Sequence, residues 1–207
     1  MRTRIDYLAN KYSFTELNES PRLRRQWQDV LEECRQTEAG PEERLRIALL
    51  NVDYVTSFEL PFRLLLTRTP QLIAALREEW GISQKNVVFN DKRFGCVYSL
   101  KASLSGVPDT FQYHLSHRIR RVVGNENTSL PYQQVAREVK VPRERLKYAL
   151  EAGLLVTALD GLFWSGSQRI AADVLRLRQS GMPVVTTNVE VHDNLTGTTR
   201  KVPTYHL

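Results

Sequence analysis

Two short polar stretches of this 207-residue chain combine arginine, glutamine and small hydroxyl side chains. The first holds Thr67, Arg68, Thr69 and Gln71, and the second holds Ser165, Ser167, Gln168 and Arg169. Arginine and glutamine make paired hydrogen bonds to guanine and adenine edges in the major groove of DNA, and small hydroxyls can approach a phosphate closely. The eight residues are therefore candidates for contacting a nucleic acid, although each is equally explained as a polar residue at a solvated helix start.

A cationic pair follows each polar stretch, beside residues that favour a turn. Lys92 and Arg93 lie within Asn90–Gly95, and Arg200 and Lys201 follow Asp193–Gly197. Cationic side chains on a hairpin can contact phosphates and release the counterions bound there. The alternative is that the four charges serve solubility. Three further arginines between the two stretches, which are weaker candidates for phosphate contact, are Arg118, Arg120 and Arg121.

Motifs for catalysis or for metal binding are not found in the sequence. His114 and His117 share a helical spacing, but no cysteine or carboxylate at ligand spacing joins them, so we expect no metal site. Cys34 and Cys96 form no Cys-x-x-Cys motif and are typical of thiols in a reducing compartment. Glycine-rich phosphate loops, nucleophile elbows and paired acidic motifs are also missing. We therefore expect neither an enzyme nor a cofactor or small-molecule ligand.

The spacing of the two stretches is part of an internal repeat. Shifting the sequence by 101 residues places Pro41–Arg77 on Pro142–Arg178 without a gap, with 12 identities in 37 positions. Chance alone gives about two identities over this length, and a fixed period of this kind indicates a duplicated supersecondary unit. Arg68 and Arg169 fall at equivalent positions, which favours them over the other candidates.

The periodicity within each copy predicts three helices followed by a hairpin. The first helix begins at Pro41 or Pro142, where proline suits the first turn. The second begins with a capping box, Thr56-x-x-Glu59 in one copy and Thr157-x-x-Asp160 in the other. The third is expected to have Thr69 as its cap and Pro70 just inside it, or to follow Ser165-Gly-Ser167 in the second copy, and to stop at Gly81 or Gly181. Alternating apolar and polar residues around Asn, Asp and Gly then indicate the hairpin.

These elements predict a fold class that is mainly α with small β-hairpins, built from two tandem winged helix-turn-helix units. The expected domains are a helical segment at 1–40, a first unit at 41–100, a helical basic connector at 101–141 and a second unit at 142–207. A different interpretation makes residues 132–153 a helix-turn-helix of their own, with Leu154–Trp164 as a short wing. The repeat favours the first interpretation, because the equivalent residues 53–66 lack a turn dipeptide.

The segment from Arg145 to Leu207 resembles the small winged helix-turn-helix proteins of phages and other bacterial mobile elements. The resemblance depends on Thr157, on Leu177-Arg-Gln-Ser-Gly181 and on Tyr205-His-Leu207. The first copy departs by one extra residue, in Leu76-Arg-Glu-Glu-Trp-Gly81. The resemblance implies DNA binding at the level of the family.

Composition agrees with a basic globular protein. The formal net charge is +6, the pI is about 9.5, and 42% of the residues are hydrophobic. A basic balance favours a polyanionic partner, and no stretch reaches the ~20 apolar residues of a membrane span. We expect a cytoplasmic, sequence-specific protein that binds double-stranded DNA and regulates transcription in a mobile element, with self-association through residues 1–40 or 101–140 left open. The alternatives are a replication initiator or recombination accessory factor, and a protein-interaction adaptor.

Overall fold

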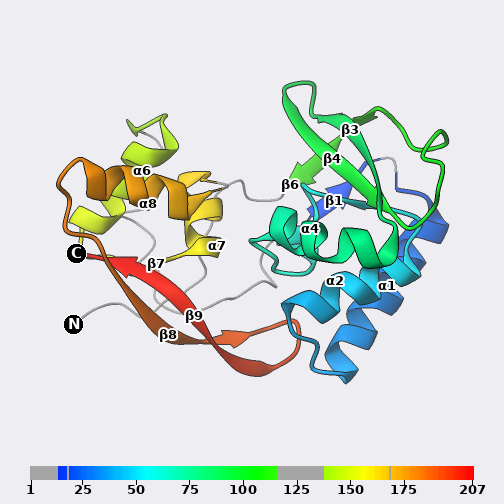
Figure 1. The fold of residues 1–207 in the computed structure, drawn as a ribbon, viewed down its shortest axis with the longest axis horizontal. Coiled ribbons are helices and arrows are strands. Elements are labelled where there is room, and N and C mark those ends of the chain that lie inside the picture. Colours follow the sequence, from blue (N-terminus) through cyan, green and yellow to red (C-terminus); the bar gives the residue numbers. More distant parts are fainter. Residues whose placement is uncertain (1–13, 18, 116–137, 168) are drawn as a thin grey trace. The chain divides into compact units, whose positions relative to one another are not determined.

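The structure is a computed structural model that describes residues 14–17, 19–115, 138–167 and 169–207 (Figure 1). The described residues form two compact units. The amino-terminal unit comprises residues 14–115 together with Leu195–Gly197, and the carboxyl-terminal unit comprises residues 138–194 and 198–207.

The fold class is α+β, so the prediction of a mainly α pair of winged helix-turn-helix units is wrong. Helices account for 43% and strands for 24% of the structure, and this strand share is ordinary for a mixed protein rather than for a mainly α one. The strands form a four-stranded mixed sheet and a three-stranded sheet in place of the small hairpins expected. The strand content is higher than predicted because both hairpins are long and each is extended into a sheet by strands from outside the hairpin.

The 101-residue repeat corresponds to the same order of elements in the two units. The amino-terminal unit runs α2 (Pro41–Asn51), β2 (Val55–Thr56), α3 (Leu60–Arg63), α4 (Thr69–Trp80), β3 (Ser83–Phe89) and β4 (Arg93–Ser99). The carboxyl-terminal unit runs α6 (Pro142–Glu151), β7 (Val156–Thr157), α7 (Ala158–Asp160), the π-helical turn η3 (Gly161–Ser165), α8 (Ile170–Gln179), β8 (Val185–Asp193) and β9 (Thr198–His206). Both first helices begin at the predicted proline.

The register of the two sheets is also equivalent. The strand order is β2-β4-β3 in one unit and β7-β9-β8 in the other, and all these pairs are antiparallel. Val55 pairs with Tyr98, and its counterpart Val156 pairs with Tyr205. The short strand after the first helix therefore docks on the second strand of the hairpin in each unit.

The two predicted capping boxes are present. Thr56 N–H donates to Glu59 Oε1 at 2.8 Å, and Glu59 N–H donates to Thr56 Oγ1 at 3.1 Å. Thr157 and Asp160 make the same two bonds at 3.0 and 3.3 Å. All four residues are buried, so these reciprocal bonds satisfy N–H groups that water does not reach. Thr157 is the N-cap of α7, whereas α3 begins only at Leu60, with Glu59 as its N-cap, which is later than the start predicted at Thr56.

An equivalent arginine joins the third helix to the hairpin in each unit. Arg77 of α4 donates to Gln84 of β3. Arg178 of α8 donates to Val184 O and to Thr186 Oγ1, both at 2.8 Å. Gln84 pairs with Tyr98 and Thr186 with Tyr205, so the two arginines reach the same position of the sheet. These bonds connect the third helix of each unit to the start of its hairpin.

The competing interpretation, with a wing at Leu154–Trp164, is wrong. These residues form the two-residue strand β7, then α7, then the start of η3. The Thr157 capping box starts a helical turn at the place where the hairpin would need extended backbone, and helical geometry therefore continues to Ser165.

The amino-terminal unit carries elements that the carboxyl-terminal unit lacks among its described residues. Helix α1 (Pro21–Gln36) packs its buried Leu23, Trp27 and Val30 into the core of this unit. Strand β1 (Phe14–Glu16) pairs with β6 (Tyr113–Leu115), and β5 (Thr110–Phe111) adds to β3 in parallel. Residues 101–115 therefore contain strands where a helical connector was predicted.

Candidate nucleic-acid interface

Helix α8 and the loop before it lie beside a group of solvent-accessible arginines, Arg143, Arg169 and Arg176. Gly166 has a φ of 72°, a left-handed conformation that glycine adopts without strain, and it ends η3. Arg169 occupies the N-cap position of α8, with no side-chain capping bond. Instead, Ser167 Oγ donates to Asp173 Oδ2 at 2.5 Å, which ties the loop to the first turns of the helix.

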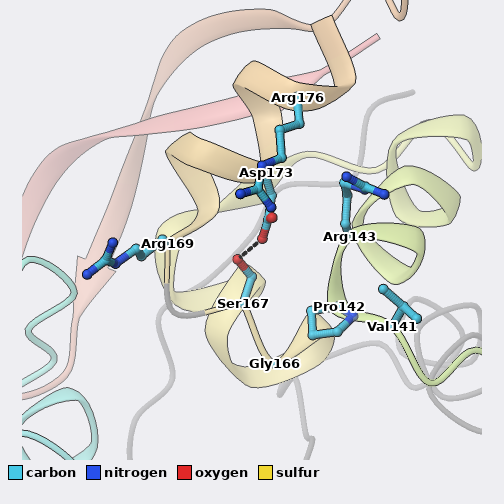
Figure 2. Close-up of a pocket in the computed structure, with 8 residues that line it drawn as sticks. All are labelled: Val141, Pro142, Arg143, Gly166, Ser167, Arg169, Asp173 and Arg176. Atoms are coloured by element: carbon cyan, nitrogen blue, oxygen red, sulfur yellow. Dashed lines mark hydrogen bonds between the residues drawn. The ribbon is translucent and has the colours of Figure 1, made fainter. Parts of the chain in front are cut away.

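An open pocket of about 490 Å³ lies at this loop (Figure 2). The residues that line it come from the start of α6, from α8 as far as its last turn, and from the loop between η3 and α8: Val141, Pro142, Arg143, Gly166, Ser167, Arg169, Asp173 and Arg176. Figure 2 shows the side chain of Arg169 directed away from the bonded Ser167 and Asp173, with Arg143 on the other side of that pair. Arginines thus border the pocket from two helices.

Three arginines against one aspartate leave the pocket with a formal charge of +2. Arg169 and Arg176 are exposed and have no ion-pair partner among the described residues. Within the described part of the chain, the ion-pair partner of Arg143 is Glu144, at 3.7 Å, and both side chains are more than 40% exposed. The pocket also borders the amino-terminal ends of two ten-residue helices, which add positive partial charge. The arrangement therefore favours an anion.

Arg169, Asp173 and Arg176 lie on one face of the α8 axis, since their spacings of four and three residues match the helical repeat. The other side of α8 carries Ile170, Val174 and Leu177, which are buried in the core of the unit. Because the apolar face is fixed in this core, the charged face is held toward solvent. The α8 part of the site is thus a preformed surface, and α6 adds Arg143 to it.

The equivalent surface of the amino-terminal unit has a different charge. The repeat places Glu42, Leu72 and Ala75 where the carboxyl-terminal unit has Arg143, Asp173 and Arg176. Glu42 accepts a bond from Arg46 at 2.9 Å, and Leu72 packs against the core. Together with Arg68, these residues carry one positive and one negative charge, so the formal charge of the four positions is zero. Only the copy in the carboxyl-terminal unit retains a basic surface here.

The predicted recognition residues of the first copy divide between surface and core. Arg68 is exposed at the N-cap position of α4, and Gln71 is exposed in its first turn. Thr67 is half-buried. Thr69, predicted as the cap, is instead the first helical residue, and its buried Oγ1 has no hydrogen-bond partner among the described residues.

The second copy divides in the same way. Arg169 is exposed, whereas Ser165 and Ser167 are only 1% and 4% exposed, so neither serine can reach a ligand without rearrangement. Gln168 lies outside the described residues, as do Arg118, Arg120 and Arg121. Of the candidates around α8, the structure therefore leaves Arg169 in position for a direct contact.

The two cationic pairs are not at equivalent hairpin tips. Lys92 is exposed in the turn between β3 and β4, and Arg93 is the first residue of β4. Arg200 and Lys201 lie within β9, beyond the turn. Arg200 pairs with the wholly buried Asp193 at 2.9 Å, which compensates its charge. Lys201 is 74% exposed and 4.0 Å from Glu190, so it stays accessible to an anion.

The sequence interpretation missed Arg143, Asp173 and Arg176. The period of α8 could have found two of them, since they follow Arg169 by four and seven residues. Arg143 could not be found in this way, because it reaches the pocket from a different helix. It aligns with Glu42 in the repeat, so a search for matching residues discards it.

A second group of ionisable side chains is buried in the amino-terminal unit. Arg63 donates to Glu59 at 2.9 Å and to Glu19 at 2.5 Å, and its guanidinium lies 4.7 Å from the centre of the Trp27 ring. Burial raises the pKa of Glu59 to about 7 in spite of the opposing charge of Arg63. Burial also raises the pKa of Glu16. This cluster joins β1, α1 and α3 and has a structural explanation.

The described residues contain no group of histidine, cysteine and acidic side chains that could hold a metal ion. Among the same residues, no helix is both long and apolar enough to cross a membrane.

No protein-family model matches the chain, and comparisons with curated proteins and with solved structures find no significant match. The resemblance of residues 145–207 to mobile-element proteins therefore stays an expectation from the sequence.

Proposed function

We propose that the chain binds double-stranded DNA in a sequence-specific manner, through α8 of the carboxyl-terminal unit, and regulates transcription. The observation that carries the proposal is the pocket at the start of α8, where three arginines from two helices surround one aspartate. The net charge of +6 supports a polyanionic partner for the whole chain.

The dimensions of α8 suit the major groove. An α-helix with its side chains is about 10–12 Å across, and the groove is about 12 Å wide. Arg169, exposed at the helix start, is placed to contact base edges, as residues at the start of a helix in the groove commonly do. Arg143 comes from α6 and Arg176 from farther along α8, so both are placed to contact the phosphates at the groove edge.

The test is the salt dependence of duplex binding. Dissociation constants for a selected duplex are measured at graded salt for the wild type and for the double variant Arg143→Gln, Arg176→Gln. Each lost phosphate contact lowers the slope of log affinity against log salt by about 0.9. We therefore expect the slope to fall by about 1.8, with similar losses for selected and random duplexes.

The matched control is the double variant Arg22→Gln, Arg35→Gln. It removes the same charge from exposed arginines of α1, whose ion pairs are at the surface, and we expect the wild-type slope. The proposal is wrong if the wild type binds no duplex at low salt. It is also wrong if the pocket variant and the control change the slope equally.

A second candidate function, self-association, is favoured by one observation on the amino-terminal unit. Phe94 of β4 is 87% exposed, and large exposed aromatic side chains are typical of protein interfaces. A dimer would also match the two-fold symmetry of many DNA sites. We expect Phe94→Ser to shift sedimentation equilibrium toward the monomer, whereas Leu50→Ser, at another exposed apolar residue, should have no effect. A wild type that is monomeric at every accessible concentration excludes this candidate.

A further inference from the structure

The pocket at the start of α8 contains one carboxylate among its arginines, and its position is informative. Asp173 is half-buried. Its Oδ2 accepts the Ser167 hydroxyl, and no other hydrogen bond or ion pair of the Asp173 carboxylate is found among the described residues, although its backbone N–H donates to Arg169 O at 3.2 Å. The second oxygen, Oδ1, is therefore available as a fixed acceptor on the face of α8 that carries Arg169 and Arg176.

A carboxylate at this place opposes binding to phosphate alone, because it repels the DNA backbone that the arginines attract. It favours a ligand that offers a hydrogen-bond donor at the same position. In the major groove, the exocyclic amine of cytosine is a donor that acidic side chains accept, whereas guanine offers acceptors that suit arginine. The mixture of charges in the pocket matches a base pair edge better than it matches a phosphate.

We propose that Asp173 determines specificity by accepting a hydrogen bond from the N4 amine of a cytosine, beside a guanine contacted by Arg169. This proposal rests on the proposed function and adds the base that the site selects. Ser167 is a positioning residue, because its hydroxyl holds Oδ2 and thereby orients Oδ1. The repeat supports a role beyond folding, since Leu72 occupies the equivalent position of α4.

Asp173 could instead have a purely structural role, in which its bond to Ser167 ties the loop to α8. An experiment must separate this role from base recognition. Asp173→Asn does so, because an amide oxygen can still accept the Ser167 hydroxyl while the amide NH₂ replaces the oxygen that faces the ligand. If the role of Asp173 is structural, the bond to Ser167 is preserved in this variant and the base preference stays unchanged. If Asp173 contacts a base, the preferred base changes, because a hydrogen-bond donor now replaces the acceptor.

The experiment selects duplexes from a random library with the wild type, Asp173→Asn and Asp173→Ala. In the wild type we expect one position with at least about fivefold preference for cytosine, next to a guanine. Asp173→Asn should change that position to a base with a major-groove acceptor, and Asp173→Ala should leave it without preference. Glu151→Gln is the matched control. It removes one negative charge, that of an exposed glutamate at the far end of α6, and should select the wild-type sites.

A second measurement needs no protein variant. The selected cytosine is replaced by 2-pyrimidinone, which lacks only the exocyclic amine, and we expect the wild type to bind this duplex at least about fivefold more weakly. Unchanged affinity, or an unchanged cytosine preference in Asp173→Asn, overturns the role of Asp173 while duplex binding itself stands. Failure of the wild type to bind any duplex overturns the proposed function and this inference together.

Discussion

At the scale of single residues, Glu59 connects the folding of the amino-terminal unit to pH. Its carboxyl group is fully buried, caps the turn that begins at Thr56 and accepts a bond from Arg63. Burial raises its pKa from 4.5 to about 7, and the nearby Glu16 adds to the rise. Between pH 4.5 and about pH 7, Glu59 is therefore mostly protonated in the folded protein and mostly ionised in the unfolded chain.

The sign of the effect follows from this difference. The contribution of protonated Glu59 to stability is fully present below about pH 4.5 and is lost as the pH rises through about 7. We expect Glu59→Gln, which cannot ionise, to gain up to about 3 kcal/mol in free energy of unfolding relative to the wild type between pH 5 and pH 8. Urea unfolding of the two proteins at both pH values measures it. Parallel pH profiles would show that Glu59 stays ionised throughout.

The candidate site shows what residue types alone can predict. Arg68 and Arg169 were favoured because they match in the repeat, and both are exposed at the N-cap of their helix. Ser165 and Ser167 are as polar as their neighbours, yet both are buried. Their burial depends on the π-helical turn and on the bond to Asp173, and the sequence pattern does not indicate either feature.

At the scale of elements, local signals predicted the helices well. The prolines at 41 and 142, the threonines of the capping boxes and the glycines at 81 and 181 act within one or two helical turns, so their effect can be inferred from nearby residues. Strands β1, β5 and β6 were missed because their partners are distant in sequence. Phe14 pairs with Leu115, and Phe111 pairs with Phe89. These short strands are stabilised by tertiary pairing, which local sequence patterns do not indicate.

The capping boxes give a test at this scale. Thr157→Val removes the hydroxyl that accepts from Asp160 N–H and donates to Asp160 Oδ2, while the shape of the side chain is kept. Loss of such a cap costs about 1–2 kcal/mol, and we expect this fall in the free energy of unfolding, measured with urea. Thr56→Val should cost at least as much, because the Thr56 hydroxyl also accepts from the buried Tyr113 hydroxyl at 2.9 Å. Thr199→Val, at an exposed residue of β9, should cost less than about 0.5 kcal/mol. Equal stability of all three variants would contradict the role of the boxes.

At the scale of the whole molecule, the two copies share a framework and differ in surface charge. The sheet register, the capping boxes and the arginine between third helix and hairpin are equivalent. The capping boxes and the paired residues Val55 and Val156 are buried, where a substitution would cost stability, whereas the two arginine bonds are at the surface. The positions around the start of the third helix are exposed and are free to diverge. Glu42 and Ala75 in one copy correspond to Arg143 and Arg176 in the other.

This divergence predicts that one copy carries most of the DNA binding. Arg68 and Arg169 are exposed at the same position of equivalent helices, so the two arginines form a matched pair within one chain. Arg169→Ala removes a base contact beside two further arginines, and it should weaken binding to the selected duplex by about 1–3 kcal/mol and relax the preference for one base. Arg68→Ala removes a cation from the equivalent surface of the amino-terminal unit, whose formal charge is zero. It should change affinity less than about twofold. Competition binding at fixed salt measures both. Equal losses would show that the two copies contact DNA together, and a loss confined to Arg68→Ala would assign the contact to the amino-terminal unit.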